Sequence, residues 1–184
     1  MLKQFFQKAC FGEQSTMSTW LAPLFQKDLK GRVTLYVPEN NVLSFSAPRQ
    51  RGWREYLAHI IKNGGDIRYI FTDAYEADKA SLRPLKAELE SHGSGTIKFC
   101  YFTPAVITDK EDMKHHQSLR TFHPVLAQDE HGVRMMWIES YHPPGNVTLA
   151  FDIEFIGKED ATNDVRFDRY RAILDGIIER YGME

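Results

Sequence analysis

The sequence of 184 residues contains no apolar run long enough to cross a membrane, and its first residues lack the apolar core of a signal peptide. Cysteine is rare: Cys10 and Cys100 are the only two, and neither belongs to a Cys-x-x-Cys pair. Sparse, widely separated cysteines are typical of proteins from a reducing compartment. These absences predict a cytoplasmic protein that has no membrane partner.

The chain also lacks internal repeats, low-complexity tracts and any linker rich in proline, glycine or serine. Its composition, 42% hydrophobic and 26% charged, is that of a globular domain and excludes a disordered or fibrous protein. The net charge of −2 excludes a polycationic protein that coats nucleic acid, but it is compatible with a local basic patch. We expect a single domain over 1–184, with an N-terminal helical segment over 1–31 and an α/β core over 32–182.

Three common catalytic signatures are missing as well. The sequence has no Gly-x-Ser-x-Gly elbow, no Walker loop and no His-Glu-x-x-His motif. These absences disfavour a serine hydrolase, a P-loop nucleotide-binding protein and a zinc peptidase. No cofactor is predicted, and no residue is assigned as a metal ligand.

Strand and helix patterns alternate through the first part of the core. Strands are predicted over 32–37, 66–71 and 97–102, with helical apolar stripes over 53–61 and 82–89 between them. Strands separated by helices of this size predict parallel βαβ units. The strongly polar stretch that follows, 108–120, predicts a surface loop or a short exposed helix, or a flap over a site.

The pattern changes after residue 120. Three strands, 121–128, 133–141 and 147–156, follow one another through short connections and predict antiparallel neighbours. An apolar stripe from Val165 to Tyr181 predicts a closing helix. The predicted fold is α/β, with a mixed sheet of about six or more strands and helices on both faces.

Five of the seven histidines gather in the second half of the core: His115, His116, His123, His131 and His142. Catalytic and binding groups in open α/β sheets tend to lie at strand ends and in the adjoining loops. Together with Asp129 and Glu130, these histidines are ligand types that zinc accepts. A His-rich metal-dependent hydrolase is therefore one alternative.

Three short motifs follow one another along the predicted strands. His123-Pro124-Val125, together with Glu130, has the spacing of a His-x-Lys-x4-Asp motif. Residues 139–142 have the spacing of Gly-Ser-x-Asn and keep the serine, Ser140. Residues 152–154 have the spacing of Asn-x-Glu and keep the glutamate, Glu154. In this order, over about 32–181, the chain resembles one half-unit of the phospholipase D superfamily. The resemblance implies a phospholipase D-like fold and a phosphodiesterase motif.

The same resemblance implies roles for individual residues. His123 would be the nucleophile, and Glu130 would be the carboxylate that holds its tautomer. Ser140, His142 and Glu154 would complete the site, with His142 as a replacement donor. Val125 replaces the lysine that stabilises charge on the phosphoryl oxygens, so the motif is degenerate.

The sequence thus predicts a non-catalytic, pseudoenzyme-like domain that binds a phosphate-containing ligand or nucleic acid. The alternative is an active, metal-independent phosphodiesterase or nuclease. Because a superfamily active site needs two motifs and this chain carries at most one, that alternative requires a homodimer in which two copies of His123 share a groove.

A further candidate for ligand binding precedes the second predicted strand. Arg49, Arg51 and Arg54 are interleaved with Trp53 and Tyr56. Guanidinium groups beside aromatic rings suit contacts to phosphate or to single-stranded nucleic acid. The alternative interpretation is the start of a helix with an exposed basic face.

Overall fold

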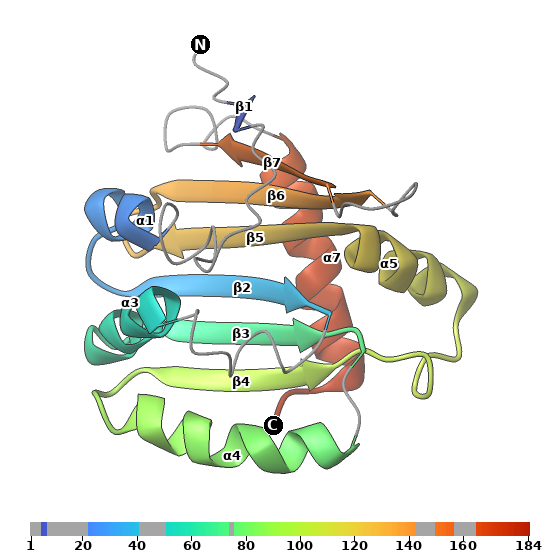
Figure 1. Cartoon of the computed structure of the whole chain (residues 1–184), viewed down its shortest axis with the longest axis horizontal. Coiled ribbons are helices and arrows are strands. Elements are labelled where there is room, and N and C mark those ends of the chain that lie inside the picture. Colours follow the sequence, from blue (N-terminus) through green and yellow to red (C-terminus); the bar gives the residue numbers. More distant parts are fainter. Residues whose placement is uncertain (1–4, 7–21, 41–50, 74–75, 143–149, 157–164) are drawn as a thin grey trace.

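The structure, a computed structural model, describes residues 5–6, 22–40, 51–73, 76–142, 150–156 and 165–184. Its centre is a mixed sheet with the strand order β1-β7-β6-β5-β2-β3-β4 (Figure 1). The strands are β1 (Phe5–Phe6), β2 (Val33–Glu39), β3 (Asp66–Phe71), β4 (Thr96–Tyr101), β5 (Phe122–Asp129), β6 (Arg134–His142) and β7 (Ala150–Ile156). The α/β class predicted from the sequence is confirmed.

Strand direction divides the sheet into two halves. Strands β2, β3 and β4 are parallel and are joined by α3 (Arg51–Lys62) and α4 (Glu76–Glu90), which confirms the predicted βαβ units. Strand β5 runs antiparallel to β2 and begins the antiparallel run β5-β6-β7. The carboxyl ends of β2 and β3 therefore lie at the same edge of the sheet as the amino end of β5.

Helices cover both faces of the sheet, as predicted. Helix α1 (Ala22–Asp28), α3 and α4 pack on one face, and α5 (Lys110–Thr121) and α7 (Val165–Tyr181) pack on the other (Figure 1). Alternate side chains of β5 point to opposite faces of the sheet. Val125 and Ala127 belong to the first core cluster, beneath α1, α3 and α4, and Leu126 belongs to the second, beneath α5 and α7. Val165, expected on the buried face of the closing helix, is 81% exposed.

Two segments differ from the sequence prediction. The polar stretch before residue 121 is a full helix, α5, capped by Asp109, whose Oδ1 accepts the backbone N–H of Glu111 at 2.7 Å. It is not simply an exposed surface segment, because it buries His116 and Leu119 against the sheet. Within 1–31, the described part contains the short strand β1, paired with β7, as well as α1.

A buried carboxylate joins the two helices of the second layer. Asp112 on α5 is 4% exposed and accepts hydrogen bonds from Arg180 Nε at 3.0 Å, Arg180 Nη2 at 2.5 Å and the Tyr181 hydroxyl at 2.7 Å. Burial opposes its ionisation, but these hydrogen bonds outweigh burial and lower the pKa of Asp112. The cluster fixes α5 to the end of α7.

The outer edge of β4 is covered by groups from elsewhere in the chain. The backbone N–H of Ile97 donates to Glu90 Oε1 at 3.3 Å, and Lys86 Nζ donates to the Ile97 carbonyl. Phe99 exchanges two backbone hydrogen bonds with Glu184, at 3.0 and 2.9 Å. These contacts occupy edge groups that would otherwise offer a template for pairing with another chain.

Removal of the Tyr56 hydroxyl is expected to stabilise the protein. The Tyr56 ring packs against Trp53 and Phe25, and its buried hydroxyl has no hydrogen-bond partner among the residues that the structure describes. Since a buried unpaired hydroxyl costs free energy, Tyr56→Phe should raise the free energy of unfolding by about 1 kcal/mol. In the matched control Tyr36→Phe, the lost hydroxyl donates to Asp175 at 2.6 Å, so stability should fall by about 1 kcal/mol. Urea unfolding of both variants would contradict this account if Tyr56→Phe were the less stable one.

Candidate functional site

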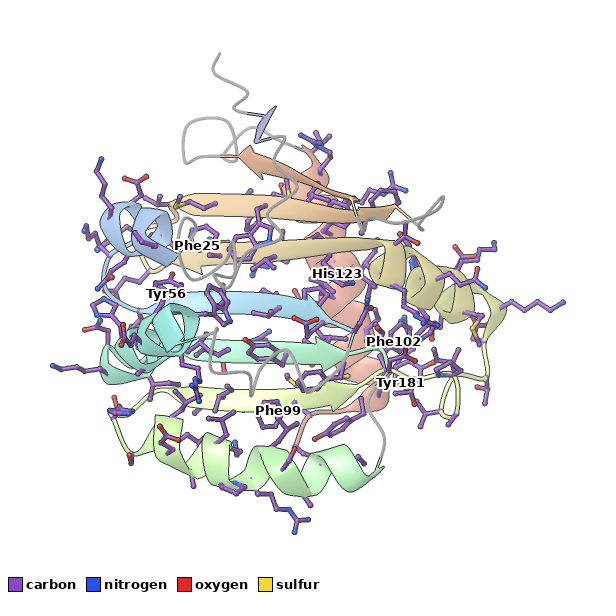
Figure 2. All side chains as sticks on the ribbon, viewed as in Figure 1. Phe25, Tyr56, Phe99, Phe102, His123 and Tyr181 are labelled. Atoms are coloured by element: carbon purple, nitrogen blue, oxygen red, sulfur yellow. The ribbon has the colours of Figure 1, made fainter. Side chains whose placement is uncertain are left out.

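Three strands bring polar groups together at one edge of the sheet. Asn40 follows β2, Thr72 follows β3 and His123 lies at the start of β5. The Nε2 atom of His123 is 3.1 Å from Oδ1 of Asn40, which also accepts the Thr72 hydroxyl at 3.0 Å. Figure 2 shows His123 near the end of β5 that α5 leads into. The carboxyl edge of parallel strands is the usual ligand position in open α/β sheets.

The imidazole of His123 is neutral at physiological pH. The residue is 2% exposed, and burial lowers its pKa to about 4, against a smaller upward effect of its hydrogen bond to the backbone of Arg120. A neutral imidazole is the form that attacks phosphorus. Here, however, the ring is buried, and its Nε2 atom is at hydrogen-bond distance from the amide oxygen of Asn40.

A second buried histidine meets the same cluster from the other layer. His116 on α5 is 2% exposed, its Nε2 atom lies 2.9 Å from the Thr72 carbonyl, and its ring stands edge-on to Phe102 at 5.7 Å. Thr72 is therefore the link between His116 and the Asn40–His123 pair. The sequence prediction includes neither Asn40 nor Thr72, although Thr72 directly follows the predicted strand 66–71 and Asn40 lies three residues after the predicted strand 32–37.

The surface beside this cluster carries a guanidinium group and an aromatic ring. Arg120 is half exposed and pairs with Asp73, Nη2 to Oδ2, at 2.8 Å. Phe122, next to His123 in the chain, is 41% exposed and is one of few large apolar residues on the described surface. We refer to Asn40, Thr72, His123, Arg120 and Phe122 as the His123 edge.

The structure does not bring Glu130 to His123. His123 lies at the start of β5, and Glu130 directly follows the last residue of that strand; the seven positions between them correspond to about 23 Å along an extended strand. The Glu130 carboxylate instead accepts Arg32 Nε at 3.1 Å. Glu130 therefore does not hold the His123 tautomer, and the side chain at hydrogen-bond distance from the ring is Asn40.

Val125, at the place of the motif lysine, is part of the apolar core. It is 1% exposed and lies opposite Trp137 in the β5–β6 register. No cation can reach the His123 ring from this position in the sequence.

The other motif residues are placed through their backbone only. Ser140 and His142 lie in β6, where Ser140 is in register with Phe122, and Glu154 lies in β7 opposite Ile138. Glu154 is thus one position away from the register line that passes through His123. The side chains of Ser140, His142 and Glu154 lie outside the described residues.

The predicted basic and aromatic cluster does not form a joint surface. Trp53 and Tyr56 are 1% and 3% exposed and belong to the first core cluster, so they offer no ring for stacking. Arg54 is half-buried on α3. Arg49 and the side chain of Arg51 lie outside the described residues.

Over the described ranges, no three His, Cys, Asp or Glu side chains come together in a way that could hold a metal ion. Two of the candidate ligands have structural roles. His116 is bonded to Thr72, and the Asp129 carboxylate accepts backbone N–H groups of Lys30, His131 and Val133 at 2.9–3.0 Å. These bonds assign Asp129 to the β5–β6 turn.

The low pKa of His123 predicts a pH-dependent loss of stability. Unfolded His123 takes up a proton near pH 6.5, whereas the folded ring stays neutral down to about 4, so the unfolded state binds more protons between these values. From about pH 6.5 to about pH 5, His123 should lower the free energy of unfolding by about 2 kcal/mol. In urea unfolding, the free energy of unfolding of His123→Gln should therefore fall by about 2 kcal/mol less than that of the wild type over this pH range. Equal slopes in the two proteins would contradict the assignment.

Comparison of the chain with protein-family models, curated proteins and solved structures finds no match. None of the described helices combines the length and the apolar content that crossing a bilayer requires.

Proposed function

We propose that the chain is a phospholipase D-like domain that binds a phosphate-containing ligand or nucleic acid at the His123 edge and does not hydrolyse it. The observation that carries this proposal is the state of His123. It stands at the motif position and at the ligand-binding edge of the sheet, yet its ring is neutral, 2% exposed and bonded to Asn40.

Three features of the motif disfavour turnover. Attack on phosphorus requires a ring nitrogen about 3 Å from the phosphorus atom, which a ring that is 2% exposed and has its Nε2 at hydrogen-bond distance from Asn40 does not offer. The position of the charge-stabilising lysine is the buried Val125, and each such donor contributes about 3 kcal/mol to the transition state. The motif carboxylate, Glu130, lies at the other end of β5.

Ligand binding is supported by the exposed part of the His123 edge. The Arg120 guanidinium is oriented by Asp73 and is 48% exposed, so it retains donors for a phosphate. The Phe122 ring, 41% exposed, lies two residues away and offers a face on which a base can stack. A guanidinium beside an aromatic ring serves single-stranded nucleic acid better than a duplex.

Fluorescence anisotropy with a labelled single-stranded oligonucleotide tests the proposal. The wild type should bind, with an affinity that falls as salt increases. Arg120→Gln and Phe122→Ala should each weaken binding by about tenfold. The control Val106→Ala removes a similarly exposed apolar side chain, at 47%, that is not one of the five residues of the His123 edge, and it should have no effect. Absence of salt-sensitive binding, or equal effects of Phe122→Ala and Val106→Ala, would refute the proposal.

One observation favours the second candidate, an active metal-independent phosphodiesterase formed by a homodimer. The neutral His123 imidazole retains the electron pair that a nucleophile requires. This candidate needs a rearrangement that frees the ring from Asn40, and it predicts turnover that resists a chelator.

A further inference from the structure

A polar pocket lies at the opposite end of the sheet from His123, between α7 and the amino ends of β2 and β3. Its volume is about 330 Å³, and the residues that line it include Arg32, Thr34, Gln128, Phe167 and Arg171. Small-molecule sites start at about 300 Å³, so the pocket suits a small molecule and not a length of polymer.

The carboxylates that border this pocket are already engaged by donors of the protein. Their bonds are Asp66 with the Thr96 hydroxyl at 2.6 Å and Arg68 Nε at 2.7 Å, Glu130 with Arg32 Nε at 3.1 Å, and Asp129 with three backbone N–H groups. The hydrogen bond from Arg32 lowers the pKa of Glu130. Burial raises the pKa of Asp66, but the hydrogen bonds from Thr96 and Arg68 outweigh burial, so the net effect is a lowered pKa. These acidic groups therefore shape the pocket while much of their charge is balanced.

The guanidinium groups, in contrast, keep unused donors. Arg32 is held through Nε alone, and its two Nη atoms have no partner among the described residues. Arg171 donates from Nη1 to Gln128 Oε1 at 2.8 Å, and its Nε lies 3.6 Å from Asp175 Oδ2. Each guanidinium is thus oriented by the protein while part of its fork stays available for an anion.

The turn before β2 is built so that Glu130 can orient Arg32. Gly31 has a positive φ of 67°, and a Cβ at this position would collide with the Glu130 carboxylate. Phe167 also lines the pocket, but its ring is 1% exposed and carries the Arg134 guanidinium 5.0 Å from its centroid, so it offers no face for stacking. What the pocket offers a ligand is therefore its unused oxyanion donors.

We propose that this pocket binds a small organic oxyanion, a phosphomonoester or a carboxylate. The anionic group lies between Arg32 and Arg171. This site is separate from the His123 edge, at the other end of the strands, and does not depend on the function proposed there.

Isothermal titration with phenyl phosphate, benzoate and inorganic phosphate tests the inference. At least one of the two organic probes, phenyl phosphate or benzoate, should bind. Arg171→Gln and Arg32→Gln should each weaken binding by about tenfold. The Arg32 side chain is 71% exposed, so its replacement should leave the fold intact. Arg169→Gln, an exposed position on the same helix outside the pocket, is the matched control and should bind as the wild type does.

Three results would overturn the inference. One is no heat of binding from either aromatic probe at about 10 mM. Another is an equal loss of affinity in Arg169→Gln and Arg171→Gln, which would indicate nonspecific attraction to the helix. The third is loss of phenyl phosphate binding in Arg120→Gln but not in Arg171→Gln, which would place the ligand at the His123 edge. Preferential binding of phenyl phosphate over benzoate, or the reverse, identifies which oxyanion the pocket selects.

Discussion

Replacing Val125 with lysine, which restores the residue type of the phospholipase D motif, is expected to destabilise the protein by about 3–5 kcal/mol and to create no phosphodiesterase activity. Val125 is 1% exposed, belongs to the first core cluster and is in register with Trp137. An ammonium group at this place would be buried without a carboxylate partner, so its pKa would fall and the folded state would lose free energy.

The matched control for this substitution is Val106→Lys. Val106 is 47% exposed, so a lysine there stays in water and should change the free energy of unfolding by less than about 0.5 kcal/mol. Chemical denaturation of both variants gives the comparison. A Val125→Lys protein as stable as Val106→Lys would show that position 125 is accessible to a ligand, contrary to the structure.

Truncation of Trp53 is the second substitution with a large expected effect. Trp53→Ala should cost about 3–5 kcal/mol, because Trp53 is 1% exposed and stands against Trp137 and Tyr56 with ring centroids 5.5 Å apart in both cases. Its indole N–H also donates to the Tyr69 hydroxyl at 2.7 Å, which joins α3 to β3. Thermal or urea unfolding measures the loss.

Trp53→Phe separates packing from hydrogen bonding at this position. It keeps an aromatic ring in the cluster but removes the donor to Tyr69, so we expect a loss of about 1–3 kcal/mol, clearly smaller than that of Trp53→Ala. Equal stability of the wild type and Trp53→Ala would show that the aromatic cluster does not hold α3 on the sheet.

The relative direction of strands that follow one another in the chain could be predicted from sequence because local signals carry it. Apolar runs separated by helical stripes gave the parallel half, and short connections gave the antiparallel half. Helix α5 was harder to predict, because its composition is polar overall and its buried residues lie on one side only. His116 and Leu119 face the sheet, whereas Lys114 and Glu111 pair on the surface at 2.7 Å. Composition averages over a helix, but burial depends on which side each residue occupies.

The site was predictable only in part, for a geometric reason. Motif spacing selected His123, and the structure places it at a strand end of the kind that carries ligand sites in open α/β sheets, while its role in binding stays a prediction. The same spacing assigned Glu130 to the site, but an extended strand carries residues apart, and seven positions separate them by about 23 Å. Asn40 and Thr72 were missed because they come from other strands, and only the sheet order brings them to His123.

Hydrolysis of bis(p-nitrophenyl) phosphate, measured with and without a chelator for the wild type and His123→Ala, tests the central claim most directly. We expect no turnover above the buffer rate in either protein, because the His123 ring is enclosed and its motif lacks the charge-stabilising lysine. Chelator-resistant turnover by the wild type that His123→Ala abolishes would contradict the claim and identify His123 as a nucleophile. Turnover that the chelator removes would contradict it equally and assign a metal-dependent hydrolase.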